Sequence, residues 1–304
     1  MQLGIFYALL AYIIWGLLPL YIKSLHGVAP LEILLHRMVW SLVFLGAILL
    51  WRRHFGWLRE VAANPRLVLN FGASAALLCC NWFLYIWAVS ADRVVDASLG
   101  YFINPLFSVL LGVLLLHERL RPVQWLSIAI AAAGVIWLTV TAGQLPWIAL
   151  GLAASFGGYG LLRKTGALGA LEGLSLETLL LFPFAAAALA FLFLTGQDTT
   201  RAAAPGTQVL LVMAGPITAV PLLFFAAGAR RIPLSLLGLL QYAGPTLQLA
   251  LGIWLYHEPF PPQKQIGYAL IWVSLAIYAA EGLLVSKLLQ RKIISVKNEV
   301  SEST

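Results

Sequence analysis

VVDASLGYFINPLFSVLLGVLLLHERLRP, residues 94–122, decides the fold because the chain carries a second copy of its pattern. This stretch is a long apolar run with polar residues in its first half, and it ends at a His-Glu pair. A shift of 140 residues aligns the two copies at eight positions: Leu99 on Leu239, Pro105 on Pro245, Leu111 on Leu251, Gly112 on Gly252, Leu115 on Leu255, His117 on His257, Glu118 on Glu258 and Pro122 on Pro262. Chance is a poor explanation for this register, so we infer an internal duplication.

Composition places the protein in a membrane. Apolar residues make up 61% of the 304-residue chain and charged residues 10%, whereas soluble domains carry about 25% charged residues. A soluble fold of this length could not bury that much apolar surface. The net charge of +7 is spread over short loops, which argues against a nucleic-acid-binding face. Cys79 and Cys80 are adjacent in an apolar run, so we expect no disulfide framework, metal site or cofactor.

The fold class predicted from hydropathy is an all-α polytopic membrane protein with ten transmembrane helices. A spanning helix needs about 20 mostly apolar residues. That rule gives spans near 3–22, 31–51, 68–90, 94–116, 122–141, 146–163, 174–195, 207–229, 232–256 and 264–286. The duplication divides them into a first five-helix repeat at 1–141 and a second at 142–286. Residues 287–304 are polar and serine-containing, and we expect a disordered cytoplasmic tail there.

The distribution of Lys and Arg predicts the orientation. With a cytoplasmic N-terminus, fourteen basic residues fall inside, Arg163 among them, and four fall outside, so both termini are expected in the cytoplasm. Five spans is an odd number, so the second repeat enters the membrane from the opposite side. Inverted repeats suit alternating access in a secondary transporter. Because duplication also produces inert folds, a non-transporting membrane scaffold or sensor is the alternative.

The two His-Glu pairs resemble metal ligands at first sight. In the predicted topology, His117-Glu118 ends a span on the inner side and His257-Glu258 ends one on the outer side, about 30 Å away. The pairs therefore cannot share one ion. We interpret them as helix terminations, with Pro122 and Pro262 at the first positions of the next helices.

Arg37 is a basic residue inside the second span, and His36 adjoins it. Charge at the centre of a span is disfavoured by about 2.5–3.5 kcal/mol on insertion scales. One interpretation is an arginine that reaches outward and pairs with Glu32 or Asp96. The other is a positive lining for an anionic or zwitterionic substrate, or part of a gate.

Polar and aromatic side chains also recur at mid-membrane depth. This predicted substrate-binding set comprises Trp15, His36, Arg37, Asn81, Trp82, Tyr85, Tyr101, Asn104, Tyr159, Gln241 and Gln248. Substrate sites of inverted-repeat transporters lie near the midplane at the repeat interface, although amides also join helices. Pro105 and Pro245 are expected to bend their helices, either for gating or as fixed packing features.

Motifs for catalysis are missing from the sequence. It contains no P-loop signature for ATP hydrolysis and no nucleophile elbow, so we expect a protein that is not an enzyme. A transporter of this kind would be driven by an ion or substrate gradient. The coupling ion and the oligomeric state are left open.

Several motifs together resemble the RarD branch of the EamA-type drug/metabolite transporters. They are Trp15-Gly16-x-x-Pro19, Pro30-Leu-Glu-Ile, His36-Arg37, Trp40-Ser41, Asn81-Trp82, Ile86-Trp87-Ala88-Val89 and Ala97-Ser-Leu-Gly-Tyr-Phe-Ile-Asn-Pro105 through Glu118-Arg-Leu. The resemblance implies two EamA-type repeats in the bacterial inner membrane around a cavity lined mainly by helices one, three, four, six, eight and nine. Related families export amino acids, metabolites or drugs, and we expect an exporter of small amphiphilic metabolites or drugs. The branch carries the label chloramphenicol-sensitive protein, which does not make chloramphenicol the substrate.

Overall fold

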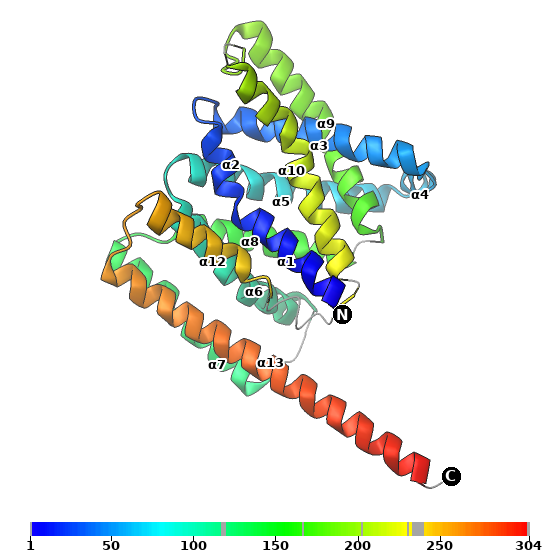
Figure 1. The fold of residues 1–304 in the computed structure, drawn as a ribbon, viewed down its shortest axis with the longest axis vertical. Coiled ribbons are helices and arrows are strands. Elements are labelled where there is room, and N and C mark those ends of the chain that lie inside the picture. Colours follow the sequence, from blue (N-terminus) through cyan, green and yellow to red (C-terminus); the bar gives the residue numbers. More distant parts are fainter. Residues whose placement is uncertain are drawn as a thin grey trace.

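The computed structural model describes residues 2–116, 120–165, 167–201, 203–229, 231–232 and 240–302. Every regular element in these ranges is helical (Figure 1). The elements are α1 (Gln2–Gly16), α2 (Leu18–Ser24), α3 (Pro30–Arg52), α4 (Trp57–Ala63), α5 (Pro65–Ser90), α6 (Val94–Leu116), α7 (Pro122–Ala142), α8 (Trp147–Thr165), α9 (Ala170–Thr195), α10 (Pro205–Ala229), α12 (Ala243–Ala250), η1 (Leu251–Leu255) and α13 (Pro262–Glu302). His117 and Glu118 lie outside the described residues.

Six helical segments in the described ranges are long and apolar enough to cross a membrane. They are Gln2–Ser24, Pro30–Arg52, Pro65–Ser90, Pro122–Ala142, Ala170–Thr195 and Pro205–Phe225. With no water in the bilayer core, a helix satisfies its own backbone polar groups, which is why such sequences are helical. The protein is therefore an all-helical, multi-pass membrane protein.

Proline and glycine define many helix ends. Pro30, Pro65 and Pro122 are the first residues of their helices, where the missing N–H is not needed. Gly143 and Gly196 follow α7 and α9 with φ of 66° and 69°, a left-handed conformation that favours glycine. These local signals explain why the helix boundaries lie close to the predicted ones.

Two segments differ from the sequence expectations, the one around Pro245 and residues 287–302. Pro245 lies in the first turn of α12, where proline is tolerated, instead of deep inside a helix. Pro105 lies within α6, but its side chain is outside the described part of the chain. Residues 287–302, for which we predicted disorder, continue α13 as helix. Their leucine, lysine, arginine and glutamine residues are good helix formers, and the segment extends a helix that is already nucleated.

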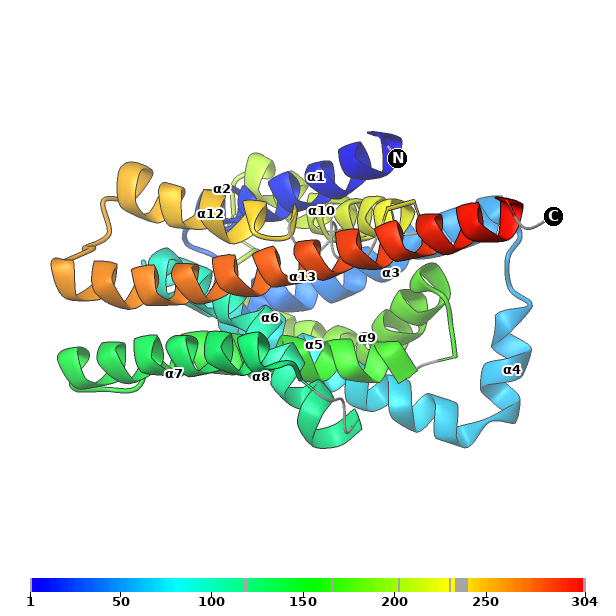
Figure 2. The ribbon, with the colours of Figure 1, turned by 90° about the horizontal axis from the view of Figure 1, so that it is seen from below.

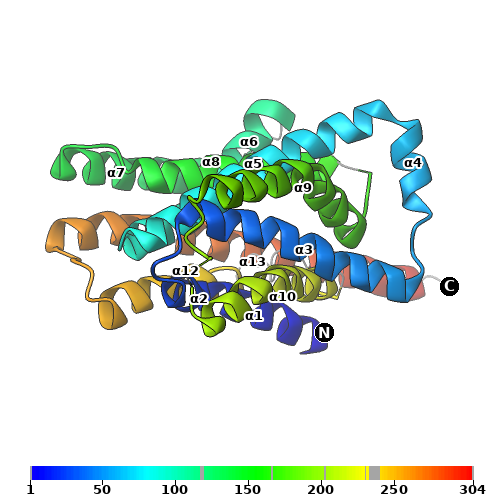
Figure 3. The same ribbon diagram turned by 90° about the horizontal axis from the view of Figure 1, so that it is seen from above.

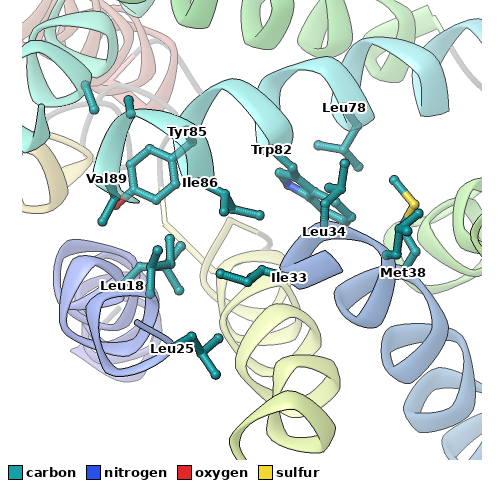
Figure 4. Packing of buried hydrophobic residues seen from close by; sticks show 14 of the residues in the cluster. Leu18, Leu25, Ile33, Leu34, Met38, Leu78, Trp82, Tyr85, Ile86 and Val89 are labelled. Atoms are coloured by element: carbon teal, nitrogen blue, oxygen red, sulfur yellow. The ribbon is translucent and has the colours of Figure 1, made fainter. Parts of the chain in front are cut away.

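The helices lie in two layers that mix the two halves of the sequence (Figures 2 and 3). One layer holds α5, α6 and α7 with α8 and α9, and the other holds α1, α2 and α3 with α10, α12 and α13. Within the layers α6 packs on α8, and α10 packs on both α1 and α3, whereas α7 packs on α13 across the layers. The largest buried cluster joins the layers, and Figure 4 shows Trp82 of α5 beside Leu34 of α3.

Candidate functional site

A cavity of about 380 Å³ lies between the layers. Its wall comes from α1, α3, α5, α6, α8, α9, α10 and α12 and the short segments that flank them, and it is mainly apolar. Ligand pockets for small molecules have this character, with few polar groups among apolar and aromatic side chains. Nine residues of the predicted binding set lie in the wall: Trp15, Arg37, Asn81, Trp82, Tyr85, Tyr101, Tyr159, Gln241 and Gln248. Pro245 also lines it.

Two members of the predicted set lie elsewhere. His36 and Asn104 are absent from the described cavity wall. Asn104 is buried, and its Oδ1 has no hydrogen-bond partner among the described residues. His36 directly precedes Arg37 on α3, and neighbouring helical residues point about 100° apart. Helix rotation thus separates two adjacent residues that the sequence grouped together.

Aromatic rings form two contiguous surfaces of the cavity. On one side, Trp15 lies 5.7 Å from Tyr12 and 5.8 Å from Phe225, measured between ring centroids. On the other side, Tyr101 lies 5.6 Å from Tyr85 and 6.2 Å from Phe156. These separations are in the range of favourable aromatic pairs.

Three of the aromatic wall residues were missed in the sequence: Tyr12, Phe156 and Phe225. A signal for two of them was present, because Tyr12 and Phe156 each precede an identified aromatic residue by three positions, on the same helical face.

The buried amides join helices. Asn81 Nδ2 of α5 donates to Leu152 O at 3.1 Å and to Ser155 Oγ at 3.0 Å, both on α8. Gln248 Nε2 of α12 donates to Trp15 O of α1 at 3.0 Å. These bonds fit the structural alternative for the two amides, and they place both side chains in the wall at fixed orientations. Gln248 Oε1 is buried without a partner among the described residues.

Arg37 is buried, with 7% of its surface exposed. Its Nε donates to Thr218 Oγ1 of α10 at 2.8 Å, and its guanidinium carbon lies 4.3 Å from the Trp82 ring centroid. The two carboxylates proposed as partners are engaged elsewhere. Glu32 accepts from Thr199 N at 3.0 Å, and Asp96 accepts from Arg93 Nε at 2.8 Å and Lys264 Nζ at 3.1 Å. The interpretation of Arg37 as an outward arginine paired with Glu32 or Asp96 is therefore wrong for this structure.

Arg163 is the second arginine of the wall, although the sequence placed it among the loop residues. It lies in the last turn of α8, and its Nη1 is 3.8 Å from Oε1 of the fully buried Glu177 on α9. Ser74 Oγ of α5 donates to the same oxygen at 2.6 Å. Arg163 Nη2 also donates to Gly169 O at 3.2 Å. The positive charge of Arg163 is thus matched by a carboxylate at one end of the cavity.

Residues of the second sequence half bind the first residues of α6. Glu258, just after η1, accepts from Val94 N at 2.7 Å and from Val95 N at 2.8 Å. The Lys264 Nζ bond to Asp96 and the Tyr268 OH bond to Val95 O lie beside it. Burial raises the pKa of Glu258, and the two amide N–H groups act in the opposite direction because they stabilise the carboxylate. Glu258 therefore caps a helix of the other half, a role that its position after a predicted span did not reveal.

Metal-binding geometry is not formed in the described part of the chain, where no three His, Cys, Asp or Glu side chains come together. The polar groups of the described wall are Arg37, which has no ion pair among the described residues, Arg163, which lies near the Glu177 carboxylate, and several amides and phenols. That set suits reversible binding of a small organic molecule.

Comparison with known proteins agrees with the architecture. Residues 2–140 match the EamA-like transporter family. The chain is 45% identical over 280 residues to protein RarD of Streptomyces exfoliatus, covering 92% of this chain and 89% of that protein. It is also 45% identical over 280 residues to an uncharacterized transporter of Pseudomonas aeruginosa, covering 92% and 94% of the two chains.

A solved structure described only as a crystal structure of a protein has the same fold, with a TM-score of 0.59 and 19% identity over 90% of this chain and 96% of that one. At that identity, the match concerns the fold alone. Sequence similarity over nearly the full length, together with the apolar helices, assigns this chain to the RarD branch of the EamA-like transporter family, as a multi-pass protein of the bacterial inner membrane.

Proposed function

We propose that the protein is a secondary transporter that moves small amphiphilic molecules by alternating access through the cavity between its two halves. The single observation that carries this proposal is that both halves of the sequence contribute residues to the cavity wall. Trp15, Trp82 and Tyr101 come from the first half, whereas Tyr159 and Gln248 come from the second. Transporters with internal repeats bind substrate at this interface, near the middle of the membrane.

The helix contacts support ten spans arranged as two inverted repeats, 1–141 and 142–286. If α1, α3, α5, α6 and α7 correspond to α8, α9, α10, α12 and α13, then contacts occur in equivalent pairs. The α1–α10 contact corresponds to α8–α5, and α3–α10 corresponds to α9–α5. Likewise, α3 packs on α9 and α7 on α13, which are contacts between counterparts. This is the pattern expected around a two-fold pseudo-axis in the membrane plane.

The direction that we propose is export. Gly160, Arg163 and Ala170 line the cavity close to the end of α8 that the Lys and Arg distribution places in the cytoplasm. At the opposite end, Glu258 and Lys264 of the second half bind the start of α6. Wall residues near the cytoplasmic end, together with bonds between the two halves at the opposite end, support loading of a substrate from the cytoplasm, which is the first step of export.

Transport is tested by filling the cavity with a large side chain. Leu223 of α10 lines the cavity, so Leu223→Trp should reduce flux to the level of protein-free liposomes while the protein still folds. The measurement is uptake of radiolabelled chloramphenicol and phenylalanine into proteoliposomes that contain purified protein. Both tracers are amphiphilic aromatic molecules of suitable size.

The matched control for this experiment is Met213→Trp, a tryptophan substitution on the outside of the same helix. Met213 is 42% exposed, away from the cavity, so flux should remain at the wild-type level. Equal flux in the two variants would contradict transport through this cavity. Protein-dependent flux of neither tracer in the wild type would favour the scaffold or sensor alternative.

A further inference from the structure

We infer that the cavity selects an amphipathic anion, an apolar or aromatic body with one carboxylate, and that Arg37 binds the carboxylate. This inference rests on the proposed function, because it names the substrate class of the same cavity. It starts from the charges of the described wall. The wall contains the cations Arg37 and Arg163, and none of its described residues is an aspartate or glutamate.

The two arginines differ in their electrostatic environment. Arg163 Nη1 is 3.8 Å from the Glu177 carboxylate, and Arg163 Nη2 is bound to a backbone carbonyl. Arg37 has no carboxylate within ion-pair distance among the described residues. Its one hydrogen bond to a described residue goes from Nε to Thr218 and leaves the two terminal nitrogens for other acceptors. Among the described residues, the cavity therefore carries one positive charge that no carboxylate compensates.

A buried guanidinium without a counterion is unfavourable in a low-dielectric interior. Stacking on Trp82 and the Thr218 bond offset only part of this penalty. The guanidinium fork matches a carboxylate, which can accept two parallel hydrogen bonds. A bound carboxylate would thus supply the negative charge that none of the described residues places at Arg37.

Neighbouring hydroxyl groups extend the same site. Tyr85 and Tyr101 line the cavity together with Arg37, and their ring centroids lie 5.6 Å apart. Tyr85 is only 2% exposed, lines the cavity, and its OH has no hydrogen-bond partner among the described residues. A buried hydroxyl in this state is available to donate to an anion. The rings of Tyr101, Phe156 and Trp15 provide the apolar and stacking surface for the rest of the ligand.

Three isosteric ligands test the charge preference: phenylpropionate, phenylpropanol and phenylpropylammonium. Binding to the purified full-length protein in phosphatidylcholine nanodiscs is measured by isothermal titration calorimetry. Wild-type protein should bind phenylpropionate about 10- to 100-fold more tightly than the alcohol or the ammonium. A wild-type protein that binds the three equally, or prefers the alcohol or the ammonium, would overturn the inference.

Variants assign the preference to Arg37. Arg37→Gln should remove the preference for the anion, whereas Arg37→Lys should retain part of it because the charge is kept. Arg201→Gln is the matched control, since Arg201 is exposed outside the cavity, and it should bind as the wild type does. An anion preference that survives in Arg37→Gln would exclude Arg37 as its source.

Tyr85→Phe keeps the inference testable if Arg37→Gln does not fold. It removes a hydroxyl that makes no bond to the described protein, so the thermal midpoint should not fall, while phenylpropionate affinity should fall severalfold. Unchanged affinity in both Tyr85→Phe and Arg37→Lys would count against the site. Anion-selective binding without flux would refute transport and leave this inference intact. Flux of the tracers, together with equal binding of the three phenylpropyl ligands, would support transport and refute this inference.

Discussion

Gly215→Ala should strongly destabilise the protein, because Gly215 lies where α10 meets the backbone of α3. A Cβ atom at Gly215 would lie 2.3 Å from Trp40 O and 2.6 Å from Trp40 C. Both are backbone atoms, so no side-chain rotation relieves the overlap, and the helices must move apart. Overpacking typically destabilises by about 1–3 kcal/mol and occasionally more. We expect a loss at or above the upper end of that range, measured as the free energy of unfolding in mixed micelles with increasing SDS.

The same substitution on the partner helix is the control. Gly46 lies on α3, and a Cβ atom there meets nothing within 4 Å. Gly46→Ala should therefore leave stability unchanged or increase it by about 0.5–1 kcal/mol, because alanine is the better helix former. Equal free energies of unfolding in the Gly215→Ala and Gly46→Ala variants would show that stability does not require the close approach of α10 to α3 at Gly215.

Glu258→Ala should lower the free energy of unfolding by about 2 kcal/mol or more and loosen the start of α6. Glu258 accepts two backbone N–H groups, from Val94 at 2.7 Å and Val95 at 2.8 Å. Both valines are buried, with 0% and 1% of their surfaces exposed. A buried donor that loses its partner is disfavoured by about 1–3 kcal/mol. Alanine removes both acceptors at once.

Hydrogen exchange by mass spectrometry locates the effect of Glu258→Ala. Deuterium uptake should rise in peptides that cover residues 94–97, because their amides lose the carboxylate. Glu60→Ala is the control, since Glu60 is exposed on α4 and makes no bond to a described residue of the second half. If uptake at 94–97 matches the wild type in Glu258→Ala, Glu258 does not hold this helix start.

Much of the fold was predictable because its signals are local. Pro30 and Pro122 start helices, and Gly143 ends one, through backbone geometry that needs no distant partner. Hydropathy gave the helical class for the same reason, since each spanning helix satisfies its own backbone. The candidate cavity was partly predictable as well. Trp82 and Tyr85 share a helical face three residues apart, and both line it.

Charge pairing was not predictable, because it depends on how helices are rotated and which ends meet. The sequence offered Glu32 and Asp96 as partners of Arg37, yet the structure engages both elsewhere. Arg163 looked like a loop residue, but the last turn of α8 directs it into the cavity wall.

The sequence by itself determined the all-helical membrane class, most helix boundaries and much of the aromatic character of the cavity, because these follow from hydropathy, from proline and glycine, and from helical spacing. Only the tertiary structure decided that Glu258 caps α6 of the other half and that Arg37 faces the cavity with no carboxylate partner in the described part of the chain. The physical reason is that both outcomes depend on distances between helices far apart in the chain, and no local pattern encodes those distances.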